Sequence, residues 1–225
     1  MSGTQDDDTS RQAVLAAVAD VVAGRRIPRV AIDGVDGAGK TTFADDLAGL
    51  LTARGLAVVR ACVDGFHNVR AVRHRRGRHD PEGFWLDSYD YPRLRAELLE
   101  PFGPGGDRRH RLAIHDVASD AMLDGPLSAA PPDAVLVVDG IFLQRSELTG
   151  CFELVVWLDA PFEATYARMA VRDGSPSDPE DPANRRYLEA QRRYLGECSP
   201  RDRADVVVDV TDVLAPRLVR PARIP

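Results

Sequence analysis

The residues of this chain with the clearest chemistry form one short run, Gly34-Val35-Asp36-Gly37-Ala38-Gly39-Lys40-Thr41. The run fits G-x-x-x-x-G-K-[ST], in which glycines let successive backbone N–H groups turn toward phosphate oxygens. Lys40 would place a positive charge beside the β- and γ-phosphates of a nucleotide, and the hydroxyl of Thr41 can bind Mg²⁺. We therefore predict that the phosphates are held by Gly34, Asp36, Gly37, Ala38, Gly39, Lys40, Thr41 and Thr42.

The segments on either side of this run have the composition that such a loop needs. Arg29-Val30-Ala31-Ile32-Asp33 is typical of a buried strand, and Thr41 to Thr52 of a helix whose positive N-terminal end faces the phosphates. Lys40 is also the only lysine, since the other basic residues are all arginine. The alternative is a chance match in a glycine-rich loop, but it does not predict a strand before the loop and a helix after it.

The composition limits the class of protein. A chain of 225 residues with 44% hydrophobic residues has room for one α/β domain or two small ones, and we expect one domain over 1–225 with a disordered tail over 1–8. The net charge of −6 is unfavourable for a general nucleic-acid binder. The three cysteines are scattered, which predicts a reducing cytoplasm and no structural zinc. The N-terminus is unlike a signal peptide, and no apolar run is long enough for a membrane helix, so we expect a cytoplasmic protein without membrane contact.

Carboxylates follow two further strands of the expected sheet. A strand over 56–63 ends at Asp64, and the apolar run 135–138 ends at Asp139. Parallel strands place chemistry at their carboxyl ends, so both side chains are expected near the phosphate loop. An apolar run that ends in Asp is common, but downstream of a phosphate loop it indicates a carboxylate that holds Mg²⁺. With strands at 154–158 and 206–210, the pattern predicts a five-stranded parallel sheet covered by helices on both faces.

The middle of the chain carries candidates for the substrate region. The run 70–80 is rich in arginine and is interpreted either as a solvated loop or as a segment from which one or two arginines meet phosphate or substrate. Residues 109–114 and 118–123 alternate and are expected to form a hairpin around His115-Asp116-Val117. The nearby aromatic residues fit either core packing or a wall on which a flat substrate stacks; they are Phe84, Trp85, Tyr89 and Tyr91.

The segment over about 161–203 is expected to form a helical lid. It reads as a helix, a loop at 174–179 and a second helix over 184–195, with arginines on both helices. Arginines on such a lid can stabilise charge on a phosphoryl group in transfer. The alternative is a charged helical hairpin that faces solvent.

Three kinds of phosphate-loop protein were weighed: a small-molecule kinase, a GTPase and an ATPase module. Guanine recognition of the form [NT]-K-x-D needs a lysine, and Lys40 is already used in the phosphate loop. Nothing in the sequence resembles the further arginine and sensor motifs of an ATPase module. A kinase needs a phosphate loop, a metal carboxylate, a base for the acceptor hydroxyl and a lid that excludes water, and the chain has a candidate for each.

From about residue 29 to 212 the chain resembles the uridine kinase-like family of P-loop kinases, which includes phosphoribulokinase and bacterial pantothenate kinase relatives. The motifs that carry the resemblance follow one another in the family's order. They are the phosphate loop with Thr41-Thr42, Asp64-Gly65-Phe66-His67, Ile114-His115-Asp116, Val138-Asp139-Gly140-Ile141, Arg168 with Arg172-Asp173, and Pro200 with Ala204-Asp205-Val206-Val207.

The resemblance implies a role for several of these positions. Asp64 matches the catalytic carboxylate that takes or orients the proton of the acceptor hydroxyl. Thr41 and Asp139 match the magnesium positions. Arg168 and Arg172 match lid residues that contact phosphates.

Other positions are implied at the acceptor, and some depart from the family pattern. His115 falls where uridine kinases tend to place an aromatic residue near the substrate, and His67 follows Asp64 closely enough to line the same pocket. Uridine kinases usually have Glu-Gly-Ile at Asp139-Gly140-Ile141 and Asp-x-Phe-Tyr at residues 64–67. Residues 83–91 do not match their substrate segment.

We therefore expect a P-loop NTPase fold, a three-layer α/β/α domain with a β-hairpin substrate region and a helical lid. With ATP and Mg²⁺ it would phosphorylate a hydroxyl of a small metabolite. A nucleoside is the first choice of acceptor, on the argument that flat bases stack on aromatic side chains. Pantothenate or a sugar phosphate is the alternative, followed by an ATPase module, and the family resemblance allows a homo-oligomer. The predicted catalytic residues are Lys40, Asp64, Arg168 and Arg172, and the predicted substrate residues are Asp64, His67, Phe84, Tyr89 and His115.

Overall fold

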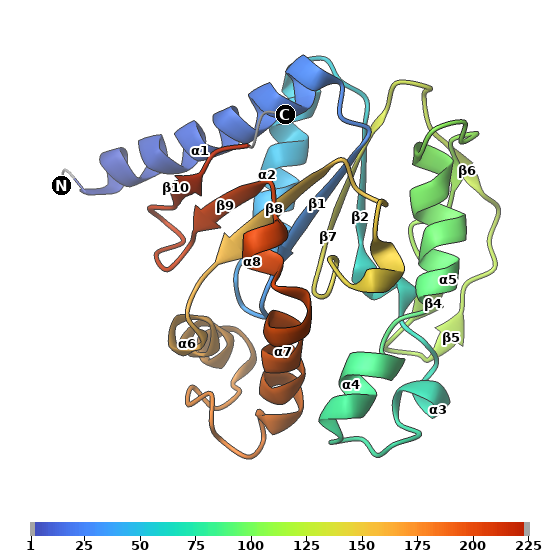
Figure 1. Ribbon diagram of the computed structural model, residues 1–225, viewed down its shortest axis with the longest axis vertical. Helices are drawn as coiled ribbons and strands as arrows, with labels where there is room; N and C mark the ends of the chain where they lie inside the picture. Colours follow the sequence, from blue (N-terminus) through green and yellow to red (C-terminus); the bar gives the residue numbers. More distant parts are fainter. Residues whose placement is uncertain (1–2, 223–225) are drawn as a thin grey trace.

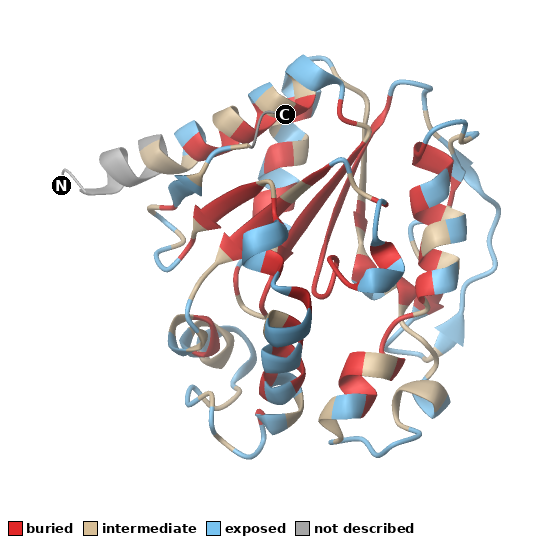
Figure 2. Ribbon diagram, in the orientation of Figure 1, coloured by how far each residue is buried: buried red, intermediate tan, exposed pale blue. Residues whose placement is uncertain are grey.

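The computed structural model of the chain describes residues 3–222, with side chains from residue 10 onward. Its centre is a six-stranded sheet in the order β10-β9-β8-β1-β7-β2, buried along most of its length (Figures 1 and 2). Five of the strands are parallel, as the sequence predicted. They are β1 (Arg29–Gly34), β2 (Val58–Cys62), β7 (Val135–Gly140), β8 (Leu154–Asp159) and β9 (Val206–Asp209).

The sixth strand, β10 (Arg217–Arg220), corrects the predicted count of five. It pairs antiparallel with β9 and closes one edge of the sheet, where Arg217 forms an ion pair with Asp209 at 2.9 Å. Two arginines, Arg217 and Arg220, flank only two apolar residues in this segment, so its sequence lacks the apolar run of a buried strand.

One face of the sheet is covered by α1 (Gly3–Arg25) and α2 (Lys40–Ala53). Helix α2 packs on β1, β2 and β7, and α1 packs on α2 and β10. The chain is helical from Gly3, where the sequence predicted a disordered tail through residue 8; residues 1–2 lie outside the described residues. The apolar stripe of α1 is buried, with Val14, Leu15, Val18 and Val22 at 7% exposure or less.

Side chains alternate between the two faces of the sheet along β1, so the contacts of Arg29 and Asp33 show which helices cover the opposite face. Arg29 donates to the carbonyl of Leu99, whereas Asp33, on the same face, accepts from Tyr194 of α7. Two groups of helices therefore cover this face. One is the run α5 (Tyr91–Leu94), η2 (Arg95–Leu99) and η3 (Glu100–Phe102), and the other is α7 (Arg185–Cys198) with α8 (Pro200–Arg203).

The expected substrate region forms beside the end of β2, at the side of the molecule that holds α3, α4 and the small β-ladders (Figure 1). The short hairpin joins β4 (His115–Asp116) to β5 (Ala121–Met122), so His115 lies in a strand and not in the turn that the sequence predicted. The segments before and after this hairpin, residues 109–110 and 128–129, pair with each other in a second antiparallel ladder. The remaining elements here are η1 (Val63–Phe66), α3 (Arg70–Arg73), α4 (Pro81–Asp87), β3 (Arg109–His110) and β6 (Ser128–Ala129).

The segment predicted as a lid contains α6 (Phe162–Asp173) and α7, joined through residues 174–184, as its sequence pattern predicted. A short helix, η4 (Ser146–Leu148), precedes β8. Helix α7 buries Leu188, Ala190 and Tyr194, so it is packed into the domain along one side. Within residues 3–222, none of the helices is long and apolar enough to cross a membrane.

Candidate active site

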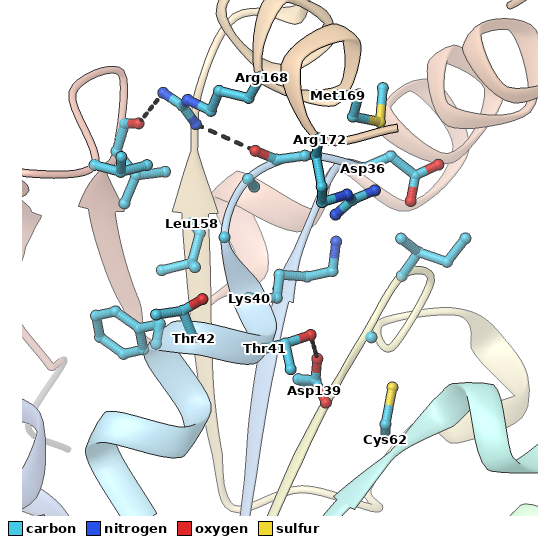
Figure 3. A pocket seen from close by; sticks show the side chains of 18 of the residues that line it. Asp36, Lys40, Thr41, Thr42, Cys62, Asp139, Leu158, Arg168, Met169 and Arg172 are labelled. Atoms are coloured by element: carbon cyan, nitrogen blue, oxygen red, sulfur yellow. Dashed lines mark hydrogen bonds between the residues drawn. The ribbon is translucent and has the colours of Figure 1, made fainter. Parts of the chain in front are cut away.

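A cavity of about 600 Å³ lies at the carboxyl ends of the parallel strands. The phosphate loop and the start of α2 form its floor, α6 and the loop after β9 cover one side, and the ends of β2 and β7 form the other (Figure 3). Lys40, Thr41, Asp64, Asp139 and Arg172 all line it. The structure thus brings together predicted residues that lie up to about 130 positions apart in the sequence.

The phosphate loop has the backbone that its glycines allow. Gly37 and Gly39 have φ angles of 74° and 85°, in the left-handed region that favours glycine. A Cβ atom on Gly37 would also lie 2.5 Å from the carbonyl oxygen of Thr165 in α6, so this glycine lets α6 rest on the loop. The Nζ atom of Lys40 donates to the carbonyl of Val35 at 2.8 Å. Gly34 packs against Leu158 beneath the loop and does not line the cavity.

Thr41 and Asp139 meet in the cavity, as predicted for a magnesium site. The hydroxyl of Thr41 donates to Oδ2 of Asp139 at 2.6 Å, and the carboxylate is almost fully buried. Within the described residues no group of three or more His, Cys, Asp or Glu could hold a metal. One hydroxyl and one carboxylate nonetheless fit Mg²⁺, which takes oxygen ligands and commonly completes its shell with substrate phosphates and water.

Arg60 is a functional candidate that sequence reasoning missed. Its Nη1 atom lies 2.8 Å from Oδ1 of Asp139, and its Nε donates to Asp45 at 2.8 Å. The guanidinium therefore neutralises the carboxylate that would bind the metal. In the sequence, the feature that could have indicated this role is the charged Arg60 inside the otherwise apolar strand β2.

Asp64 stands at the far end of the cavity with its side chain 67% exposed. Tyr89 donates its hydroxyl to Oδ1 of Asp64 at 3.0 Å, and burial raises the pKa of Tyr89 well above 10, so the phenol keeps its proton. A Cβ atom on Gly140 would lie 2.1 Å from Cγ1 of Val63. This close approach of β7 to η1 explains how Asp64 and Asp139 come to share one cavity.

The two predicted histidines stand behind this carboxylate and do not line the cavity. His67 donates from Nδ1 to the carbonyl oxygen of Asp64 at 2.8 Å, and its ring lies 4.4 Å from that of Tyr89. Burial lowers the pKa of His67. The side chain of His115 is fully buried, with Nε2 at 3.0 Å from Oδ1 of Asp120 and no hydrogen-bond partner at Nδ1.

The aromatic cluster is mostly core, which corrects the prediction of Phe84 as a substrate residue. Phe84 is buried, with its ring 4.9 Å from Tyr187 and 5.7 Å from Phe142, both edge-on. Trp85 packs in the same way on Phe142. Of the four aromatic residues named from the sequence, only Tyr89 lines the cavity.

The two predicted arginines of α6 differ in their contacts. Arg168 donates to three backbone carbonyls, those of Gly37 at 3.2 Å, Val210 at 2.6 Å and Thr211 at 2.7 Å. It therefore ties α6 to the phosphate loop and to the end of β9. Arg172 bonds only its neighbour Asp173, and its side chain extends over Lys40 in the cavity (Figure 3).

Helix α7 supports the phosphate loop through contacts that no local motif predicted. Gln191 accepts from the backbone N–H of Asp36 at 2.8 Å and donates to its carboxylate at 3.0 Å. Tyr194 donates to the buried carboxylate of Asp33, which also accepts from Gln144 at 3.1 Å. Burial raises the pKa of Asp33 to about 6, although these hydrogen bonds lower it.

Neither a family model nor a curated protein matches the chain, but solved structures do. A possible uridine kinase from Bacillus stearothermophilus matches with a TM-score of 0.68 and 24% identity, covering 87% of this chain and 97% of the other. A candidate fructose transport system kinase from Silicibacter sp. TM1040 matches with a TM-score of 0.59 and 26% identity, covering 78% and 94%. The YGR205w protein matches with a TM-score of 0.60 and 12% identity, covering 94% and 99%.

The fold of this chain is therefore one that solved proteins described as kinases share. The matches at 24% and 12% identity support the fold, and the match at 26% is to a protein described as a kinase. The order of its motifs predicted a likeness to the uridine kinase-like family, and a possible uridine kinase is among the solved structures that share the fold of this chain.

Proposed function

We propose that the protein transfers the γ-phosphoryl group of ATP to a hydroxyl of a small metabolite. One observation carries the proposal: a phosphate loop, a Thr–Asp pair suited to Mg²⁺ and an exposed carboxylate share one cavity of about 600 Å³. Transfer of a phosphoryl group depends mainly on positioning and charge neutralisation, which these groups can supply.

The nucleotide would lie along the phosphate loop. Lys40 would exchange the Val35 carbonyl for the β- and γ-phosphates, and Arg172 would approach the γ-phosphate from α6. Mg²⁺ held by Thr41 and Asp139 would neutralise charge on the phosphates. Phe43, Val213 and Leu214 line the opposite side of the cavity and offer apolar surface for the base of ATP.

The acceptor would approach from the side of Asp64. Its hydroxyl oxygen attacks the γ-phosphorus, the bond to the β–γ bridging oxygen breaks and ADP leaves. The hydroxyl proton passes to the carboxylate of Asp64, which the hydroxyl of Tyr89 orients through Oδ1.

Two acceptor classes have support of different kinds. The likeness to a possible uridine kinase and the Tyr89 ring favour a nucleoside. The likeness to a candidate fructose transport system kinase favours a sugar or a sugar derivative. A cytoplasmic location fits the use of ATP and the three free cysteines, Cys62, Cys151 and Cys198. Self-association and the lack of nucleic-acid binding remain predictions.

Release of ADP by the purified protein with ATP and Mg²⁺ tests the proposal. The acceptors are uridine, cytidine, adenosine, nicotinamide riboside, fructose, pantothenate and ribulose 5-phosphate, with a control without acceptor. We expect turnover with one acceptor and little in the control. Equal ADP release in every reaction would instead identify an ATPase module.

A further inference from the structure

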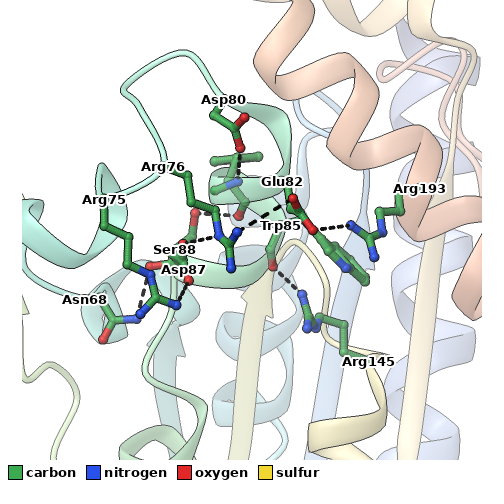
Figure 4. A network of polar contacts seen from close by, with 12 residues as sticks. Asn68, Arg75, Arg76, Asp80, Glu82, Trp85, Asp87, Ser88, Arg145 and Arg193 are labelled. Atoms are coloured by element: carbon green, nitrogen blue, oxygen red, sulfur yellow. Dashed lines mark hydrogen bonds and ion pairs between the residues drawn. The ribbon is translucent and has the colours of Figure 1, made fainter.

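The arginine-rich run 70–80 divides into two groups, and the first is structural. Arg75 and Arg76 both pair with Asp87, whose carboxylate is 1% exposed at the end of α4, and Arg76 also lies 3.7 Å from Glu82 (Figure 4). These ion pairs tie the run to α4. They account for two arginines of the run without any ligand.

The second group has too few anionic partners. Arg73 is 12% exposed at its side chain, and its Nε is buried without a hydrogen-bond partner. Arg186 of α7 also has a buried Nε without a hydrogen-bond partner. Its guanidinium donates to the carbonyl of Arg78 at 2.5 Å and lies over the rings of Phe84 and Tyr187, 5.1 and 5.7 Å from their centroids, but it forms no ion pair with a described residue. In the part of the chain that the structure describes, the side chains of Arg70 and Arg78 form no ion pair.

This second group lies directly behind the reactive carboxylate. The positive charges of Arg73 and Arg78 add to burial in lowering the pKa of Arg186, so these three side chains are close enough to repel one another. Arg73 and His115 likewise act on His67, which contacts Asp64 and Tyr89. The cluster thus lies next to His67, on the side of Asp64 that faces away from the cavity lining.

The charge balance of the cluster is incomplete. Asp120 is the carboxylate closest to Arg73, at 3.7 Å, and it already accepts from His115 at 3.0 Å and from the backbone N–H of Arg70 at 2.7 Å. Asp80 is the carboxylate whose charge acts on Arg186. Asp80 caps α4 by accepting from Gly83. Burying a guanidinium N–H without an acceptor is unfavourable, so unpartnered donors call for a ligand that completes them.

We propose that the phosphoryl acceptor carries an anionic group, a phosphate or a carboxylate, which Arg73 and Arg186 bind while its hydroxyl lies at Asp64. The proposal rests on the kinase function above and names its substrate class. Guanidinium groups suit both anions because their planar N–H donors match carboxylate and phosphate oxygens.

Binding of inorganic phosphate tests the anion site without turnover. The protein is first saturated with Mg²⁺ and a non-hydrolysable ATP analogue, so that the phosphate loop is filled, and phosphate is then titrated by calorimetry. We expect one phosphate to bind and Arg73→Gln and Arg186→Gln each to weaken it roughly 10-fold or more, since a hydrogen bond to a charged group contributes about 1.5–3 kcal/mol. Acetate in place of phosphate tests the carboxylate.

The matched control is Arg185→Gln. Arg185 is the neighbouring residue on α7, but it is exposed and already paired with Glu189 at 2.7 Å, so phosphate binding is expected to stay unchanged. Arg186→Lys keeps the charge and is expected to retain part of the binding, which separates lost charge from misfolding. No phosphate or acetate bound beyond the nucleotide site, or equal binding by all variants, would overturn the proposal.

Turnover then separates this inference from the kinase function itself. Ribose, ribonate and ribose 5-phosphate present the same carbon chain with a neutral, a carboxylate or a phosphate end, and uridine is compared with uridine 5′-monophosphate. We expect kcat/KM for an anionic member to exceed that of its neutral partner roughly 10-fold or more, and Arg186→Gln to remove the difference. Preference for a neutral acceptor would overturn the anionic class but confirm the kinase. ADP release independent of acceptor would overturn the kinase, and phosphate titration would still decide the anion site.

Discussion

The two ends of the cavity are built in different ways. At the phosphate end one continuous run, residues 34–42, supplies the loop, the lysine and the first magnesium ligand. At the acceptor end Asp64 and Tyr89 line the cavity, with His115 and Arg186 outside its lining, and these residues come from four separate segments spread over more than 120 residues. The phosphate end recognises a group common to all nucleotides, whereas the acceptor end has to recognise one particular metabolite.

This difference also appears in the contacts. The backbone of the phosphate loop is fixed by Gln191 of α7 and by Arg168 of α6, so its geometry depends little on what binds. The acceptor end keeps N–H donors without hydrogen-bond partners at Arg73 and Arg186. We infer that the first end is complete before binding, and that the second is completed by its ligand.

Removing the lysine is expected to have the largest effect. Lys40→Ala deletes the charge at the β- and γ-phosphates, so kcat should fall roughly 10³-fold or more and ATP binding should weaken, with the fold retained. ADP release and the thermal midpoint measure the two effects. If the variant unfolds, Lys40 is a structural residue, and the fold of the phosphate end depends on the side chain that contacts the phosphates.

The corresponding change at the acceptor end is Asp64→Asn. Loss of a general base should lower kcat roughly 10²- to 10⁴-fold with little change in ATP affinity, because Asp64 contacts Tyr89 and not the phosphate loop. Steady-state kinetics and nucleotide titration measure the split. Asp46→Asn, on the opposite wall of the cavity, is the control and should leave kcat close to normal.

If Asp64→Asn weakens ATP as strongly as it lowers turnover, the two ends do not act separately. Near-normal turnover would remove Asp64 from the base role. Either result would contradict the separate role that we assign to the acceptor end of the cavity.

The buried carboxylate of Asp33 beneath the loop gives a pH-dependent prediction. Its pKa is about 6 in the folded protein against 3.8 when exposed, so its contribution to stability is fully present below about pH 3.8 and is lost as pH rises through 6. Asp33→Asn cannot ionise. From pH 4 to 7 the free energy of unfolding of this variant should therefore rise, relative to the wild type, by roughly 2–2.5 kcal/mol.

Urea denaturation of both proteins across this pH range measures the difference. A difference that does not change with pH would mean that Asp33 titrates as an exposed carboxyl does. The support under the phosphate loop would then not depend on a buried charge.

The smallest expected effect belongs to the tyrosine that contacts Asp33. Tyr194→Phe removes the hydroxyl that donates to Asp33 and accepts from the backbone N–H of Gln144 at 3.0 Å. The free energy of unfolding should fall by about 1–3 kcal/mol, because buried polar atoms lose their partner. Tyr187→Phe, on the exposed side of α7, should change it by less than about 0.5 kcal/mol. Equal effects of the two changes would contradict a specific role for Tyr194.

The sequence predicted one end of the cavity better than the other for a physical reason. The phosphate loop and the strand-end carboxylates Asp64 and Asp139 are local patterns, because a backbone nest and a strand terminus are each formed by consecutive residues. Gln191 and Tyr194 reach the loop from about 155 residues away, and no local spacing reports that contact. Phe84 shows the same limit, since an aromatic residue of the core and one of a binding wall look alike in sequence.

The errors in the fold have a similar origin. Strand β10 is short and carries two arginines, and it is stabilised by pairing with β9 more than by its own composition. The hairpin was predicted with His115 in the turn because alternation was counted on either side of it. In the structure His115 pairs with Met122, and its side chain points into the protein toward Asp120.

The single lysine makes the cavity chemically addressable. A reagent that acylates amines has one ε-amino target in the whole chain, and that target lies in the nucleotide cavity, hydrogen-bonded to Val35. Apart from the terminal α-amino group, labelling of the intact protein therefore reports a single position. The mass added per chain, with and without nucleotide, would count occupied sites directly, without an acceptor or a coupled assay.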